Sequence, residues 1–286
     1  MNGTLQNTNY QYIMSLIIAK NKVQFEALMG VETPEATDSH MPIPHHTLVK
    51  LTREAIEAVG LTIVEEEHSL ARGGLRYFGG FALTGKGIDG TDRQVVLGLR
   101  NSHDKAFAAA ICIGNRMMVC ENLCFSSDVK LSRRHTLNIL SDLPRVIADA
   151  VARVVAHWND MGLRIERYKE TFISSAQAEN LLVKLVDSKA IPARDLYTNV
   201  VEFRRHMEGS ENPRHVEFVG NTLWNLYNAV TENLKGGDLS KLPFRTMTMQ
   251  SIFDKLAHHV PQLELQEIVT KGCEDNAPEG EVDLRN

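Results

Sequence analysis

The densest group of polar side chains in the sequence is Asn101-Ser102-His103-Asp104, which lies between two apolar segments. Backbone and side chains could converge there on a ligand, so the tetrad is the best candidate for a site. A metal-dependent nuclease or phosphohydrolase using His103 and Asp104 would need further His and Asp ligands, and the chain shows no such arrangement. A tight turn is the favoured alternative, because Asn and Asp tolerate unusual backbone angles and Ser caps locally. We predict neither a bound metal nor a cofactor.

A second segment, Gly80 to Gly87, matches the G-x-x-x-x-G-K pattern that cradles phosphates. In that pattern Ser or Thr follows the lysine and holds magnesium, whereas here Gly87 follows Lys86. A phosphate loop also opens a helix, but residues 88–91 are typical of a hairpin turn. The sequence therefore favours a hairpin over a nucleotide site.

Basic residues accumulate around the predicted sheet, with aromatic residues between them. Cations could hold the phosphates of a single strand while bases stack on the aromatic rings, which requires no readout of the base sequence. The alternative is ordinary solvated Arg and Lys above a core of aromatic rings. The candidate nucleic-acid contacts are Arg76, Arg100, Lys105, Arg116, Lys130, Arg133 and Arg134.

The first half of the chain predicts a sheet with a helical cover. Apolar residues at helical spacing indicate helices over residues 12–29, 46–59 and 143–158, and Gly60 stands where a C-terminal cap belongs. Between them lie short strand-like segments joined by turn residues, including an expected turn at Gly114-Asn115. Consecutive hairpins imply an antiparallel β-meander, with strands predicted at residues 61–65, 75–83, 94–99, 106–113 and 116–120.

The second half predicts a mainly helical region, so the fold class is α+β. Ser174 and Gln177 form a capping-box pattern, and Pro192 suits a helix start. The predicted helices cover residues 178–186, 192–207, 220–234 and 249–259. The chain then divides into an arm and linker at 1–40, a sheet domain at 41–170, a helical region at 171–272 and a disordered acidic tail at 273–286.

Composition limits the class of protein. The 286 residues are 43% hydrophobic, enough for a sizeable core, and the net charge of −5 confines any nucleic-acid contact to a local patch. No apolar segment approaches the roughly 20 residues that cross a bilayer, and the first residues lack the basic start and long apolar core that are typical of a secretory signal. We expect a cytoplasmic protein without a membrane partner, whose four cysteines stay reduced.

The helix predicted at residues 220–234 has two faces. Its polar side carries Asn221, Asn225, Asn228, Glu232 and Lys235 at helical spacing. A solvated face is the usual explanation for such a stripe. Asn is a mediocre helix former, however, so its excess also suits a hydrogen-bonding role.

Two segments carry a resemblance to a known family. The tetrad 101–104 and Val119-Cys120-Glu121-Asn122-Leu123 resemble the N-S-H-D and V-C-x-N-G patterns of domain of unknown function 932, although Leu123 replaces the glycine. Residues 222–237 are similar to that family's L-W-x-x-(F/Y)-N-x-V-x-E-N-L-x-x-G signature, through Trp224, Asn228, Glu232 and Asn233. The resemblance spans residues 61–256 and implies carriage by phages and plasmids, but no established reaction.

These observations lead to three functional hypotheses. The order of helix, meander and long helix is similar to that of phage single-strand annealing proteins, an analogy that does not by itself establish function. The leading hypothesis is a non-enzymatic, homo-oligomeric protein that binds single-stranded DNA through the basic face of the sheet. The alternatives are an inhibitor of a host anti-phage defence complex, suited by the net acidity, and the metal-dependent enzyme considered above.

Overall fold

A computed structural model provides the structure of the chain. It describes residues 16, 21–90, 92–117, 123–133, 136, 138–208, 220–235, 237 and 240–258, and within 123–133 it describes only the side chain of Phe125. The acidic segment 273–286 lies outside the described residues.

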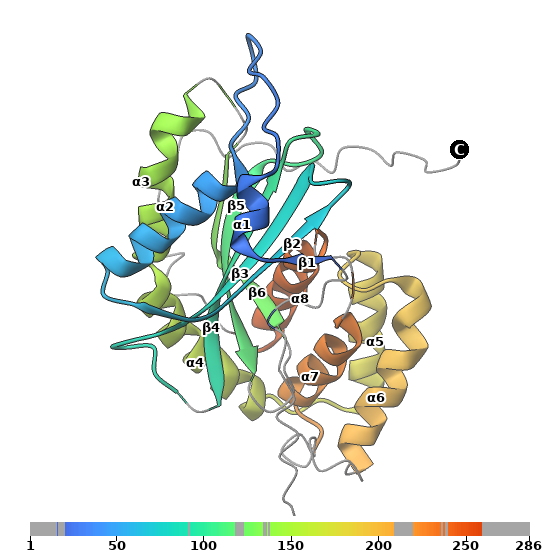
Figure 1. Cartoon of the computed structure of the whole chain (residues 1–286). Coiled ribbons are helices and arrows are strands. Elements are labelled where there is room, and N and C mark those ends of the chain that lie inside the picture. The colour runs from blue at the N-terminus through green and yellow to red at the C-terminus, as the bar shows by residue number, and fades with distance from the viewer. Residues whose placement is uncertain are drawn as a thin grey trace, which may run out of the picture.

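The centre of the protein is a six-stranded antiparallel sheet whose strands follow one another in chain order (Figure 1). The predicted meander is therefore confirmed. Each neighbouring pair is antiparallel, and glycines with positive φ at positions 73, 74, 85 and 87 occupy the first two hairpin connections, where residues with a Cβ are rare. The strands are β1 (Lys22–Val23), β2 (Thr62–Ala71), β3 (Arg76–Thr84), β4 (Arg93–Ser102), β5 (Ala109–Met117) and β6 (Leu123–Arg133).

Two features of the sheet differ from the sequence-based expectation. Gly114-Asn115 is not a turn, because β5 continues through both residues to Met117. The β5–β6 register shifts between Cys112, which pairs with Lys130, and Gly114, which pairs with Phe125, so the extra residues of this irregularity lie in β6. The predicted helix at 12–29 is also too long, because Lys22–Val23 pair with β2 and only Phe25–Met29 form a helix, α1, within the described part of that range.

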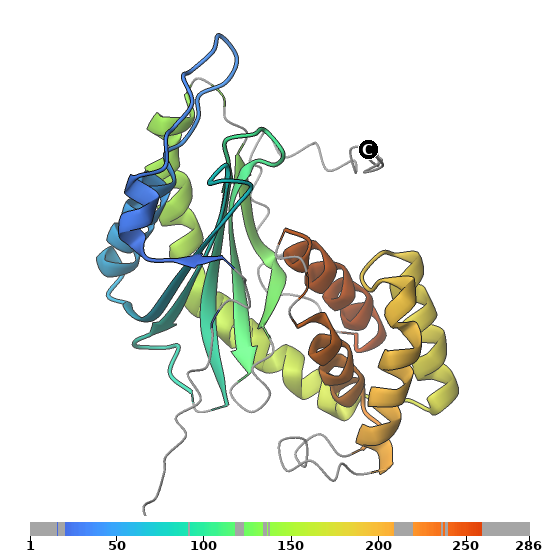
Figure 2. The ribbon, with the colours of Figure 1, turned by 45° about the vertical axis from the view of Figure 1, so that its right-hand side comes forward.

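The first face of the sheet packs against helices from its own half of the chain. Tyr77, Phe81 and Leu97 project from this face into a core shared with the apolar sides of the helices. Gly60, with φ of 75°, stands just after the helix at residues 45–58, as predicted. Figure 2 shows α1 and the two covering helices together on one side of the sheet. The covering helices are α2 (His45–Ala58) and α3 (Ile139–Val151), and α4 (Val154–Glu170) continues from α3.

The helical region lies on the opposite side of the sheet (Figure 2). The capping box of Ser174 and Gln177 is present, and α7 is buried at nearly every position because it lies at the centre of the region. α8 contacts β6, and Met247 packs with Cys112 and Phe125 on the second sheet face. The elements are α5 (Ser175–Asp187), the short helix η1 (Ala193–Asp195), α6 (Leu196–Glu208), α7 (Leu223–Leu234) and α8 (Leu242–Leu256).

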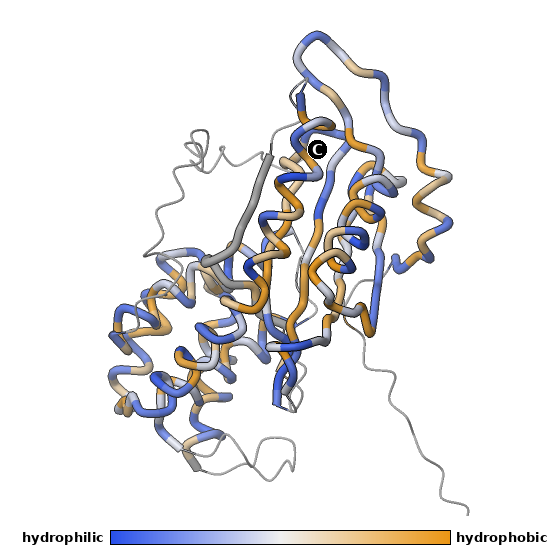
Figure 3. Tube along the Cα trace, turned by 90° about the vertical axis from the view of Figure 1, so that its left-hand side faces the viewer, coloured by the Kyte–Doolittle hydropathy of each residue, from blue (hydrophilic) through white to orange (hydrophobic). Residues whose placement is uncertain are grey.

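Hydropathy follows these layers. Figure 3 shows apolar residues concentrated along the central strands and on the helices beside them. Within the described ranges, no helix has both the length and the apolar character needed to span a membrane. The architecture is thus α+β, with a covered antiparallel meander followed by a mainly helical half.

Candidate functional site

Strand alternation sends the side chains of the tetrad 101–104 in two directions. Successive residues of β4 point to opposite faces, so Asn101 shares the α2 side with Leu99, while Ser102 shares the second face with Arg100. His103 turns back toward the α2 side, where it meets the loop that precedes α2. The four residues therefore form two separate sets of contacts, one on each side of the sheet.

Asn101 and His103 hold the chain just before α2. Ile43 O accepts hydrogen bonds from Asn101 Nδ2 at 2.6 Å and from His103 Nε2 at 2.9 Å. The His103 ring stacks on His45 with 3.9 Å between centroids, and His45 Nε2 lies 2.9 Å from Gly74 O. Because carbonyl oxygens only accept, both Nε2 atoms carry a proton. These contacts fasten the start of α2 to the sheet.

Ser102 and Asp104 close the turn on the other side. Asp104 Oδ1 accepts from Ser102 Oγ at 2.5 Å, and Asp104 Oδ2 accepts from Arg76 Nε at 2.7 Å. Partial burial alone would raise the pKa of Asp104, but the hydrogen bonds from Ser102 and Arg76 hold it below its usual range. This geometry fits the turn that the residue types favour.

His103 and Asp104 thus have different partners on different faces. Among the residues that the structure describes, no group of three or more His, Cys, Asp or Glu side chains is placed to hold a metal ion. The phosphate-loop pattern is a hairpin, as the residues after Lys86 predict, because Thr84 Oγ1 and Gly85 N both donate to Asp89 Oδ1 and no helix follows.

The basic residues separate into two groups on the second sheet face. Arg76 and Arg100 lie near the β4–β5 turn, which also carries the exposed Lys105. Arg116 pairs with Gln94 near the opposite end of β4, six residues from Arg100 along the strand, or about 20 Å. Three of the predicted nucleic-acid contacts fall outside the described part of the chain, namely the side chains of Lys130 and Arg133 and the whole of Arg134.

The first group surrounds an aromatic pair, and we call Arg76, Phe78, Arg100, Lys105 and Phe107 the cationic–aromatic cluster. The Arg100 guanidinium lies 5.1 Å from the Phe107 ring centroid, and that of Arg76 lies 5.8 Å away. Phe78 and Phe107 are 5.5 Å apart, and both are partly exposed. Arg76 is paired with Asp104, and Lys105 is exposed in the adjoining turn.

Arg100 differs electrostatically from its neighbour Arg76. Among the described residues, its guanidinium makes no ion pair or hydrogen bond, and Nε is buried. Burial lowers the pKa of Arg100, because desolvation penalises the charged form. Arg100 is therefore a partly buried cation whose hydrogen-bonding capacity is available to an anionic ligand.

The residues of α7 that match the family signature are largely buried and stabilise the helical region rather than forming an exposed surface. Trp224 is 5% exposed and stacks on Tyr227, and Asn228 Nδ2 donates to Trp224 O. Asn233 Nδ2 donates to Asn199 Oδ1 on α6, and Glu232 pairs with Lys235. The hydrogen-bonding explanation of the asparagines, rather than a solvated face, fits Asn228 and the buried Asn225 of the capping box.

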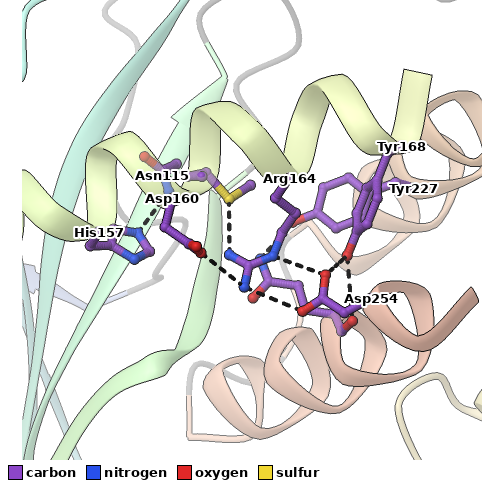
Figure 4. A network of polar contacts seen from close by, with 9 residues as sticks. Asn115, His157, Asp160, Arg164, Tyr168, Tyr227 and Asp254 are labelled. Carbon is purple, nitrogen blue, oxygen red and sulfur yellow. Dashed lines mark hydrogen bonds and ion pairs between the residues drawn. The ribbon is translucent and has the colours of Figure 1, made fainter. Parts of the chain in front are cut away.

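A buried charge network between α4 and α8 was missed by the sequence reasoning (Figure 4). Arg164 is fully buried, and its Nε and Nη2 donate to the two oxygens of Asp254 at 3.0 and 3.2 Å. Asp160 Oδ2 lies 3.4 Å from Arg164, and Tyr168 Oη donates to Asp254 Oδ1 at 2.6 Å. The available signal was the four-residue spacing of Asp160, Arg164 and Tyr168, which places them on one side of a helix.

Fold and contacts together define an α+β protein in which a helix-covered meander is joined to a helical bundle through a buried ionic network. The chain belongs to the family described as Domain of unknown function (DUF932), whose model matches residues 36–257. The match confirms the resemblance carried by the two motifs and extends it to include α2. No curated protein and no solved structure matches the chain significantly.

Proposed function

We propose that this protein is a non-enzymatic, oligomeric binder of single-stranded DNA that acts in the cytoplasm of a cell carrying a phage or plasmid, and that the cationic–aromatic cluster is its contact surface. The single observation that carries the proposal is Arg100, a partly buried guanidinium without an anionic partner among the described residues. A buried cation is costly unless it is paired, and a backbone phosphate would supply the missing charge.

The surroundings of Arg100 suit a single strand better than a duplex. Phe78 and Phe107 are partly exposed, and exposed rings can stack against bases that are not already stacked in a helix. Lys105 is exposed in the adjoining turn and adds a second cation for the backbone. This mode of binding requires no base-specific contacts, so weak sequence preference is expected.

The proposal is tested by fluorescence anisotropy with a labelled oligothymidylate over a salt series. Affinity should fall steeply with ionic strength, because released counterions drive the binding. Arg100→Ala should weaken binding about tenfold. It should also make the plot of log affinity against log salt concentration shallower by the amount that corresponds to about one phosphate contact. Arg145→Ala is the matched control, since Arg145 is exposed on α3 and carries the same charge. The proposal would be refuted by no rise in anisotropy at low salt, or by an equal loss of affinity in Arg100→Ala and Arg145→Ala.

The same experiment separates the proposal from an inhibitor of a defence complex. The net charge of −5 suits protein partners as well as local nucleic-acid contacts. An inhibitor would bind its partner after nuclease treatment and would be indifferent to Arg100→Ala in an oligonucleotide assay.

A further inference from the structure

Arg116 crosses the second face of the sheet in an unusual way. It starts on β5 and reaches Glu65 on β2, although β4 and β3 lie between the two strands. Ala82 and Val96 face each other in the β3–β4 register on this path, and both are fully buried. Ala82 is also the β3 partner of Glu65, and its small side chain leaves room for the long Arg116 side chain to reach that carboxylate.

Among the described residues, acceptors are found for only one nitrogen of the Arg116 guanidinium. Nη2 donates to Glu65 Oε2 at 2.7 Å and to Gln94 Oε1 at 2.6 Å. Nε and Nη1 are buried and, across the described ranges of the chain, have no acceptor. The Arg116 side chain is 5% exposed, so bulk water does not satisfy these donors.

Buried donors in native proteins are paired with protein groups, ordered water or a bound ion. A guanidinium presents its donors in a planar fork that matches the oxygens of phosphate and carboxylate. Gln94 uses its carbonyl oxygen for Arg116, which leaves its amide nitrogen as a neighbouring neutral donor. Glu65 is 27% exposed at its side chain and marks the side of the site nearest solvent.

From this geometry we infer an oxyanion-binding site in which Arg116 Nε and Nη1, assisted by the Gln94 amide, hold a phosphate or another small oxyanion. The inference is independent of the proposed function, because the site lies about 20 Å from Arg100 and a free anion can occupy it without a nucleic acid. Glu65 neutralises part of the charge of Arg116 and competes for the same guanidinium.

The test measures the melting temperature of the full chain in inorganic phosphate and in chloride at matched ionic strength. We expect a saturable rise in melting temperature with phosphate. Arg116→Met should weaken the apparent affinity at least about tenfold, the factor for one hydrogen bond to a charged group. Glu65→Gln should strengthen it, because the competing carboxylate is removed while the side-chain shape is kept. Arg145→Met is the control for an equal change of charge at an exposed site.

Two results would overturn the inference: no effect of phosphate beyond chloride, or an effect that Arg116→Met and Arg145→Met retain equally. Glu65→Gln keeps the test decisive if Arg116→Met does not fold, because unchanged phosphate affinity in that variant also contradicts the site. A parallel oligothymidylate titration identifies the source of the anion. Loss of strand affinity in Arg116→Met indicates a nucleic-acid phosphate, whereas unchanged strand affinity with lost phosphate response indicates a free anion.

Discussion

The buried network between α4 and α8 allows a quantitative prediction for Asp254→Ala. Asp254 accepts three hydrogen bonds, two from Arg164 and one from Tyr168. Without it, the fully buried Arg164 loses its closest carboxylate among the described residues, and Asp160 lies farther away, at 3.4 Å. Removing one partner of a buried pair leaves a desolvated charge, and the typical cost is about 3–5 kcal/mol. We therefore expect the free energy of unfolding to fall by that amount.

Urea unfolding followed by circular dichroism measures this loss. The control is Glu179→Ala, which breaks the exposed Glu179–Arg204 pair and should cost about 0–1 kcal/mol. Replacing both residues, as in Arg164→Met with Asp254→Leu, should cost less than the sum of the single changes, because each single change leaves the other member of the Arg164–Asp254 pair buried without its partner. A loss for Asp254→Ala no larger than that for Glu179→Ala would refute the reasoning.

Two further predictions concern the first sheet face. A Cβ at Gly79 would lie 1.9 Å from Tyr77 Oη, so Gly79→Ala must displace that buried ring and its hydrogen bond to His68. We expect a loss of about 2–4 kcal/mol in the free energy of unfolding, measured in urea. The control Gly30→Ala should be close to neutral, because no atom lies nearer than 3.6 Å to the added Cβ. Burial alone would raise the pKa of Glu66, but hydrogen bonds from His68 and Arg53 lower this pKa below its usual value of 4.5. The ionised Glu66 therefore stabilises the fold fully above pH 4.5, and this stabilisation is lost as the pH falls through the pKa of the folded state. Glu66→Gln should therefore flatten the acid limb of stability against pH, and an unchanged limb would contradict the assignment.

Features that depend on neighbouring residues in the chain were predictable. Gly60 could be placed at the end of α2, and Ser174 with Gln177 at the start of α5, because caps depend on backbone angles within one turn. The residues after Lys86 indicated a hairpin for the same reason. The turn predicted at Gly114 was wrong, since a glycine inside a strand and a glycine in a turn have the same local signature.

The sequence by itself determined the antiparallel meander followed by a helical half, the connections after β2 and β3, and the family, because each depends on short-range patterns. Only the tertiary structure decided which charges meet. Arg76 meets Asp104, Arg116 reaches Glu65 across two strands, and Arg164 meets Asp254 from a helix ninety residues away. The side of a strand on which a cation lies follows from alternation, but its partner depends on strand register and helix docking, and neither is encoded in local spacing.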